Sequence, residues 1–191
     1  MEEKLNKLYK ECIEELKSIG IDIDIRTIEI QISKRNNKRY GCCKQEDPDK
    51  NTKYYEKIGN KRYLRYAKYN KHTIEISKWV MMLDESIIKN TIIHEIIHCL
   101  PYCNNHKNEF KKYANYINEK LGYDISRVGN KKQDYEKSNM EYTENVNFKY
   151  KIICEKCNQT FYRQRLMKNL TKKYRCGICG GKLKIFYKLY T

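Results

Sequence analysis

A five-residue motif carries the strongest chemical signal in the sequence: His94-Glu95-Ile96-Ile97-His98. On a helix, residues four apart lie on the same face, so His94 and His98 can present their imidazoles to one metal ion. Glu95 lies one residue round from His94, where its carboxylate can act as a general base without binding the ion. The motif therefore predicts a catalytic zinc site with Glu95 as the base.

A third ligand is needed, because a catalytic zinc ion usually has three protein ligands and one open position. Pro101 ends the motif helix, and the chain can then turn back to offer His106 from the start of the next helix. His106 is therefore the predicted third ligand. Three weaker candidates stay open at this point: the carboxylate of Glu109 and the thiols of Cys99 and Cys103.

Four cysteines later in the chain predict a second metal site. They form two C-x-x-C pairs, Cys154/Cys157 and Cys176/Cys179, with the spacing of a zinc ribbon. Four thiolates close the coordination sphere of zinc, so this ion would be structural. A domain this small has little core, and the metal would supply its folding energy, about 10–16 kcal/mol in zinc-finger peptides. We thus expect two zinc ions per chain, one catalytic and one structural.

Positive charge is concentrated around these cysteines. The chain has 40 Lys and Arg against 24 Asp and Glu, a net charge of +16, and residues 145–191 hold twelve of these cations and one acid. Cations can follow phosphates while aromatic rings stack on unpaired bases, a pattern that favours single-stranded nucleic acid as a partner. The predicted contact residues are Phe161, Tyr162, Arg163, Arg165, Lys172, Lys173, Tyr174, Arg175 and Lys184, with further rings at Phe186, Tyr187 and Tyr190. The alternative is that half of these rings build the small core of the ribbon and that the lysine bias comes from an A/T-rich genome.

Helical spacing predicts three helices that would position the histidines. An N-terminal helix covers residues 3–19, and the metal-binding helix runs from a cap at Asp84 to Leu100. A further helix begins near Asn105 and ends at Gly122.

Alternating apolar residues predict a small sheet. Strands are expected over residues 28–32, 40–44 and 73–76, and two Tyr-rich runs around Gly59-Asn60 predict a hairpin. His72 follows a polar stretch and is expected to be a solvated loop residue.

The chain is expected to form two domains of an α+β protein. Residues 1–126 form the first, residues 127–145 are polar and aperiodic and read as a linker, and residues 146–191 form the small β zinc ribbon. No apolar run approaches the roughly 20 residues that cross a bilayer. The first residues also lack the apolar region of a signal peptide. A cytoplasmic protein without membrane contact is expected.

The histidine pattern resembles that of the SprT-like metallopeptidase family, to which the DNA–protein crosslink protease Spartan belongs. In that family the third histidine usually opens an H-G-x-x-F motif. Here His106 is followed by Lys107 in place of the glycine, and Phe110 is kept. The segment "RYGCC" at residues 39–43 and the segment leading from Thr73 into the metal-binding helix are also similar to the family.

This resemblance implies a zincin-like metallopeptidase domain, with an N-terminal helix, a small mixed sheet and a metal-binding helix, followed by the ribbon. It also implies a zinc-dependent endopeptidase that acts on DNA-bound or DNA-crosslinked proteins, as in DNA repair, with the basic ribbon engaging DNA. The alternative is a catalytically inactive or regulatory DNA-binding accessory protein on the same fold. A peptidase of free proteins is a third hypothesis.

Overall fold

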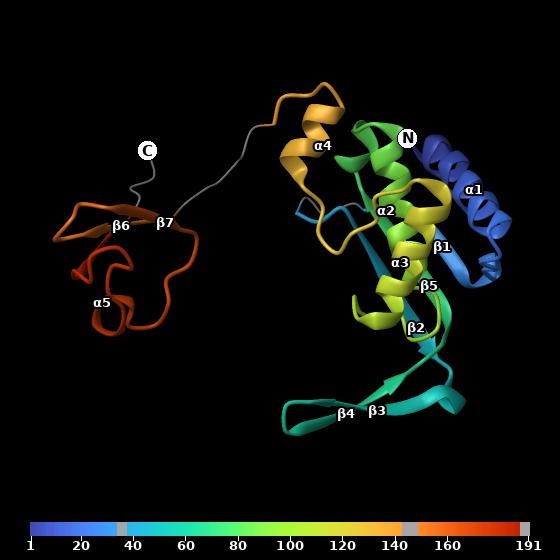
Figure 1. Ribbon diagram of the computed structural model, residues 1–191, viewed down its shortest axis with the longest axis horizontal. Helices are drawn as coiled ribbons and strands as arrows, with labels where there is room; N and C mark the ends of the chain where they lie inside the picture. Colours follow the sequence, from blue (N-terminus) through green and yellow to red (C-terminus); the bar gives the residue numbers. More distant parts are fainter. Residues whose placement is uncertain (34–37, 143–148, 188–191) are drawn as a thin grey trace. The chain divides into compact units, whose positions relative to one another are not determined.

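The computed structural model describes residues 1–33, 38–142 and 149–187, which belong to two separately packed units, Met1–Tyr142 and Thr143–Thr191 (Figure 1). The first unit contains α1 (Glu2–Ser18), β1 (Ile28–Ser33), β2 (Gly41–Pro48), β3 (Lys53–Ile58), β4 (Lys61–Tyr66), β5 (Tyr69–Ser77), α2 (Glu85–Ile97), α3 (Asn108–Leu121) and α4 (Lys131–Lys137). Short 3-10 helices lie at Ile25–Thr27, Lys50–Thr52 and Val80–Met82. The second unit contains β6 (Tyr150–Cys154), β7 (Thr160–Arg163), α5 (Leu170–Lys173) and β8 (Leu183–Tyr187).

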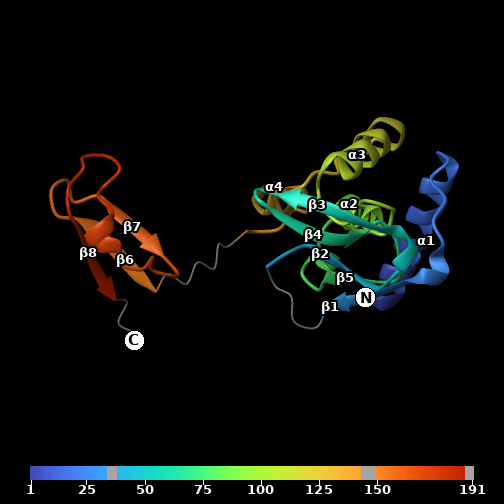
Figure 2. The same ribbon diagram turned by 90° about the horizontal axis from the view of Figure 1, so that it is seen from below.

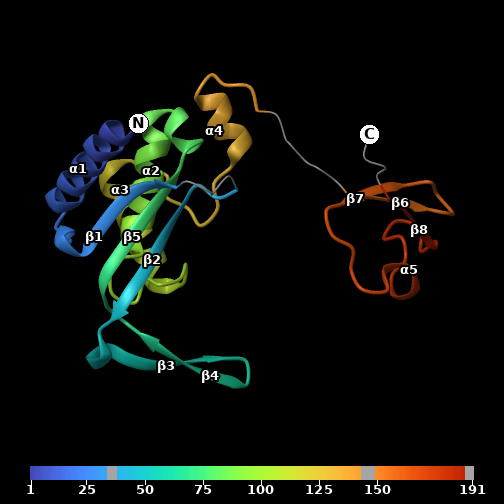
Figure 3. The ribbon, with the colours of Figure 1, turned by 180° about the vertical axis from the view of Figure 1, so that it is seen from behind.

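A three-stranded sheet in the order β1-β5-β2 forms one layer of the first unit. β1 runs parallel to β5 and β2 runs antiparallel to it, so the sheet is mixed, as the sequence predicts. Helices α1, α2 and α3 lie on one face of this sheet (Figures 1, 2 and 3). Helices on one face of a small mixed sheet make an α+β architecture.

Helix α2, which carries His94 and Glu95, is the centre of the core. Its isoleucines are buried on every side, which is typical of a helix enclosed by other elements; these are Ile87, Ile88, Ile92, Ile93, Ile96 and Ile97. α2 packs against both α1 and α3. Among the described residues, no helix has the length and apolar character of a membrane-crossing segment.

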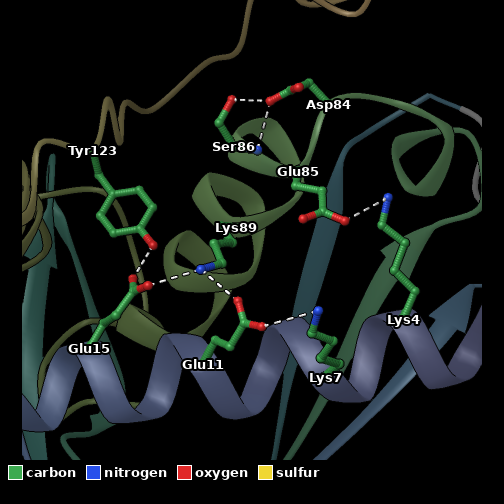
Figure 4. Close-up of polar contacts among 9 residues, drawn as sticks. All are labelled: Lys4, Lys7, Glu11, Glu15, Asp84, Glu85, Ser86, Lys89 and Tyr123. Carbon is green, nitrogen blue, oxygen red and sulfur yellow. Dashed lines mark hydrogen bonds and ion pairs between the residues drawn. The ribbon is translucent and has the colours of Figure 1, made fainter.

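A polar cluster fastens α1 to α2. Nζ of Lys89 lies 2.8 Å from Oε2 of Glu11 and 2.9 Å from Oε1 of Glu15, as Figure 4 shows. Tyr123, beyond α3, donates its hydroxyl proton to the same Glu15 carboxylate. Lys89 therefore joins two carboxylates of α1 to the centre of α2, where its side chain is only 19% exposed.

β3 and β4 form the predicted hairpin. They pair antiparallel from Lys53↔Tyr66 to Ile58↔Lys61, and Gly59 at the turn has a φ of 58°. That positive φ explains the glycine, because residues with a Cβ rarely adopt it. The hairpin extends beyond the ends of β2 and β5 instead of covering their sheet (Figures 1 and 3).

The prediction for His72 is wrong. His72 is 2% exposed and lies inside β5, which begins at Tyr69 and is longer than the predicted strand. It pairs with Ile28 of β1 and Gln45 of β2, so it lies in the central strand of the sheet. The missed signal is the period of two, because His72 precedes Ile74 and Ile76 on the same face of the strand.

The predicted linker over residues 127–145 is also wrong for much of its length. It contains α4, which contacts the first unit: Tyr40 donates a hydrogen bond to Asp134, and Tyr135 stacks on Trp79 with ring centroids 6.0 Å apart. The first unit therefore extends to Tyr142. A helix of seven residues is too short to show apolar periodicity, and α4 is fixed by these tertiary contacts.

The second unit is built on a sheet in the order β7-β6-β8. Both neighbours run antiparallel to the central strand β6. Ile152 of β6 is 2% exposed and Leu170 of α5 is 6% exposed, which shows how little apolar core the unit has. A unit with so small a core needs another source of stability.

The Lys89 cluster predicts a difference between two substitutions that change the net charge equally. Lys89→Met leaves Glu11 and Glu15 without their shared cation, and we expect the midpoint of thermal unfolding to fall by about 2–8 °C. In the matched control Lys7→Met, the lost partner is a 74% exposed lysine 3.8 Å from Glu11, and the midpoint should stay within about 1 °C. Equal midpoints for the two variants in differential scanning calorimetry would show that the Lys89 cluster does not stabilise the packing of α1 against α2.

Candidate metal centres

Three histidines converge at one point of the first unit. His94 lies on α2, His98 is the residue that ends α2, and His106 lies in the loop before α3. Nε2 of His106 is 2.9 Å from Nε2 of His94 and 3.2 Å from Nε2 of His98. Nitrogen ligands about 2.0–2.1 Å from a tetrahedral zinc ion are about 3.3–3.4 Å apart. The three atoms thus have close to the spacing of a zinc ligand set.

The second nitrogen of each ring shows which atoms are available to a metal. Nδ1 of His98 lies 2.6 Å from the carbonyl oxygen of Cys103, so Nδ1 carries the proton and Nε2 holds a lone pair. The backbone of Ser126 hydrogen-bonds to the ring of His94, and Nε2 of that ring faces Nε2 of His106. Two ring nitrogens then face Nε2 of His106, which can donate at most one proton. A cation between the rings would satisfy all three nitrogens.

Phe110 supports the three imidazoles from α3. Its ring centroid is 4.9 Å from that of His94, 4.8 Å from that of His98 and 4.7 Å from that of His106. Burial lowers the pKa of all three imidazoles, and that of His94 falls to about 3 because neighbouring histidines add to the effect of burial. The neutral ring is the form that binds a metal, so this pocket favours the ligand state.

The carboxylate of Glu95 points toward β2. Glu95 is 6% exposed, and the backbone N–H of Cys43 donates a hydrogen bond to it. A Cβ atom at Gly41 would lie 2.8 Å from Oε1 of Glu95, so only glycine leaves room for the carboxylate there. Burial raises the pKa of Glu95 to about 7, against the lowering effects of Cys43 and Arg39. A cation between the imidazoles would add a further lowering effect.

A cavity of about 860 Å³ contains Glu95 and all three histidines. Its walls come from β2, from α2 and from the segment between α3 and α4; the last of these contributes Ser126, Arg127, Val128, Gly129 and Asn130. Sequence reasoning missed this wall, because it placed the segment in a linker. In the sequence Gly41 stands out only as part of "RYGCC", and no local pattern connects it to Glu95.

The weaker third-ligand candidates do not join the histidine cluster. Glu109 forms an ion pair with Lys112 at 2.7 Å. Cys103 is fully buried, and Sγ of Cys99 lies 3.6 Å from Sγ of Cys43. Of the candidates considered, the structure brings His106 to His94 and His98.

The four cysteines of the second unit also converge. Sγ of Cys154 is 3.4 Å from Sγ of Cys179, and Sγ of Cys157 is 3.7 Å from Sγ of Cys176. Sulfur ligands about 2.3 Å from a tetrahedral zinc ion are about 3.8 Å apart. The backbone N–H of Cys157 is the main cause that lowers the pKa of Cys154 to about 6, which favours a thiolate. The cluster fits a closed, four-thiolate zinc site.

The register of the ribbon sheet places some of the predicted DNA-binding residues on an exposed face and others on a packed face. Lys151 of the central strand pairs with Tyr162 and with Phe186, and all three side chains are exposed. Ile152, which is buried, pairs with Phe161, so the ring of Phe161 belongs to the packed face. One exposed face thus presents two rings on either side of a lysine that sequence reasoning did not select.

The other predicted residues of the ribbon are exposed as well. They are Arg163, Arg165, Lys172, Lys173, Tyr174, Arg175 and Lys184. Nζ of Lys184 lies 5.3 Å from the ring centroid of Phe186, next to the row. Tyr190 and the side chain of Tyr187 lie outside the described residues.

Metal content should separate the two centres. We expect about two zinc ions per wild-type chain, and about one after His98→Ala or after Cys157→Ser, because each variant loses one ligand of a different cluster. Cys42→Ala removes a thiol outside both clusters and should retain two. Inductively coupled plasma mass spectrometry of dialysed protein gives the stoichiometry. Two zinc ions in the His98→Ala variant would contradict the histidine site.

Comparison with known proteins places the first unit in a family. No curated protein matches the chain. Residues 2–134 match the SprT-like family, which is generally a family of metallopeptidases. The matched region includes the three convergent histidines and Glu95, and it covers more than half of the sequence. The chain therefore belongs to the SprT-like family.

Proposed function

We propose that the chain is a zinc-dependent endopeptidase with a zincin-like first unit. The observation that carries the proposal is the convergence of His94, His98 and His106, with the carboxylate of Glu95 in the same cavity. Membership of a family of metallopeptidases supports it.

The histidines and the residues around them can each take a separate role in peptide hydrolysis. Zinc bound by the three imidazoles would supply a Lewis acid that polarises the scissile carbonyl and makes a water molecule more acidic. Glu95 accepts a proton from the attacking water and donates it to the leaving amine. The backbone N–H of Cys43 orients this carboxylate, and Gly41 gives it space.

β2 offers a place for a peptide substrate. It is an edge strand of the described three-stranded sheet, and its residues Gly41, Cys42 and Cys43 line the cavity. Edge strands can pair with an extended peptide through backbone hydrogen bonds. A chain bound in this way would run past Glu95, which suits cleavage within a polypeptide.

The proposed substrates are proteins bound or crosslinked to DNA, met in the cytoplasm. The exposed row of Tyr162, Lys151 and Phe186 on the ribbon supports engagement of single-stranded DNA, since rings can stack on bases beside a phosphate-binding cation. The four-thiolate cluster leaves no open position, so its proposed role is to hold this surface together.

A second candidate is a catalytically inactive or regulatory DNA-binding accessory protein. The observation that favours it is that the exposed row on the ribbon does not depend on the histidine site. The two candidates differ in whether Glu95 acts on a substrate.

Substitution of the base tests the peptidase proposal. We expect Glu95→Gln to keep both zinc ions and to lower cleavage of a DNA-binding protein by at least about 10²-fold, because the amide cannot accept the proton. Gel-based cleavage assays with and without single-stranded DNA give the rates. If Glu95→Gln cleaved at the wild-type rate, Glu95 would not be the general base. DNA binding without any cleavage by zinc-loaded wild type would favour the accessory protein.

Gly41 should matter for catalysis because it leaves room for the Glu95 carboxylate. In Gly41→Ala the new methyl group would displace the Glu95 carboxylate, and we expect kcat/KM to fall by about 10–100-fold with both zinc ions retained. Lys44→Ala is the control, since Lys44 lies on the same strand but its side chain is exposed and pairs with Glu75. Its kcat/KM should stay within about twofold. A Gly41→Ala enzyme as active as the control would show that β2 does not position the base.

A further inference from the structure

We propose that one face of the β3–β4 hairpin, formed by Lys53, Tyr55, Lys57, Arg62, Leu64 and Tyr66, binds single-stranded nucleic acid. This inference goes beyond the proposed function, because it concerns neither the metal site nor the ribbon. It is independent of peptidase activity.

The pairing of the two strands defines this face. Residues directly opposite in an antiparallel pair point to the same side, and Tyr55 pairs with Leu64 while Lys57 pairs with Arg62. The guanidinium of Arg62 lies 5.5 Å from the ring centroid of Tyr55, which confirms that they share a side. Tyr55 is 65% exposed and Leu64 is 45% exposed. We call these six residues the outer hairpin face.

Part of the opposite face is occupied by contacts within the first unit, whereas Ile58 and Tyr63 on that face are exposed. Glu56 forms ion pairs with Arg65 and with Lys107, and Tyr54 lies 5.5 Å from Tyr102 between ring centroids. Lys107 follows His106, so this side of the hairpin is attached to the loop that carries the third histidine. These contacts of Glu56 and Tyr54 hold the hairpin in place, and the outer hairpin face points away from them.

The charge on the outer hairpin face is positive and lacks acidic neighbours. Lys53, Lys57 and Arg62 are exposed. Among the residues that the structure describes, none of the three forms an ion pair with a carboxylate. Glu56, the one acid of β3 and β4, lies on the opposite face. Cations without carboxylate partners leave a field that attracts a polyanion.

The mixture of rings and cations favours single-stranded nucleic acid over other polyanions. An acidic protein or an anionic lipid surface would satisfy the three cations but has no need of an exposed tyrosine between them. Unpaired bases can stack on Tyr55 while the cations contact phosphates on both sides, a mode that tolerates any sequence. Tyr55 is flanked by Lys53 and Lys57 on its own strand and by Arg62 across the hairpin.

Two triple variants of the full chain test the charge contribution. The first is Lys53→Gln, Lys57→Gln, Arg62→Gln. The control is Lys10→Gln, Lys17→Gln, Lys111→Gln, which changes exposed lysines of α1 and α3 and takes the net charge from +16 to the same +13. Fluorescence anisotropy with a 20-nucleotide oligo-dT should show binding weakened by at least about tenfold in the first variant and by less than about threefold in the control. The slope of log affinity against log salt should flatten by about 2 in the first variant only, at about 0.7 per lost phosphate contact.

Two single variants test the ring. Tyr55→Leu keeps an apolar side chain but removes stacking, and it should weaken oligo-dT binding by at least about fivefold, whereas Tyr55→Phe should bind like wild type. Equal affinities of Tyr55→Leu and wild type would overturn the proposal, as would equal losses in the two triple variants or no binding of oligo-dT by wild type. Loss of binding to phosphatidylserine vesicles with unchanged binding to oligo-dT would identify a lipid surface instead.

The same variants keep this inference separate from the proposed function. Cleavage of an unfolded protein without nucleic acid should be unchanged in the hairpin variants, since the outer hairpin face lies outside the cavity around Glu95. If the hairpin variants cleave protein normally and bind DNA like wild type, the hairpin surface is rejected and the peptidase proposal is unaffected. If wild type does not cleave protein but its DNA binding depends on the hairpin residues, the peptidase proposal is rejected and the hairpin surface is supported.

Discussion

The convergence of three imidazole nitrogens is the constraint on which the first unit depends. Hydrogen bonds to the backbone of Cys103 and of Ser126 hold the rings of His98 and His94, and Nε2 of each ring faces Nε2 of His106. Without a cation, at least one ring nitrogen has no partner in a partly buried site, which costs free energy. A metal ion would turn this arrangement into a bonded one, which supports the proposed zinc site.

The surrounding elements follow from that constraint. α2 is enclosed by apolar contacts on every side, which fixes the direction of His94 and Glu95 on the helix. α3 supplies Phe110, whose ring contacts all three imidazoles. β2 completes the site from the sheet with Gly41 and with the backbone N–H of Cys43. Helix packing therefore places the ligands, while the sheet edge places the proposed base.

Much of this arrangement could be predicted where the signal is local. Apolar periodicity predicts α1 and α2, Tyr-rich runs around a Gly-Asn turn predict the hairpin, and ligand spacing predicts both metal clusters. The errors lie where tertiary contacts decide: His72 is buried on the central strand of the sheet, and α4 is held by Tyr40 and Trp79 from far away in the chain. The fit of Gly41 against Glu95, and the division of the ribbon and hairpin into faces, required the strand register. Residue types alone do not contain that information.

Anomalous diffraction at the zinc absorption edge, from crystals of the zinc-loaded full chain, tests the central claim most directly. The account predicts one peak about 2.0–2.1 Å from Nε2 of each of His94, His98 and His106, and a second peak about 2.3 Å from the four cysteine sulfurs. A first peak bound instead by the thiols of Cys43 and Cys99, or no peak near the imidazoles, would contradict it.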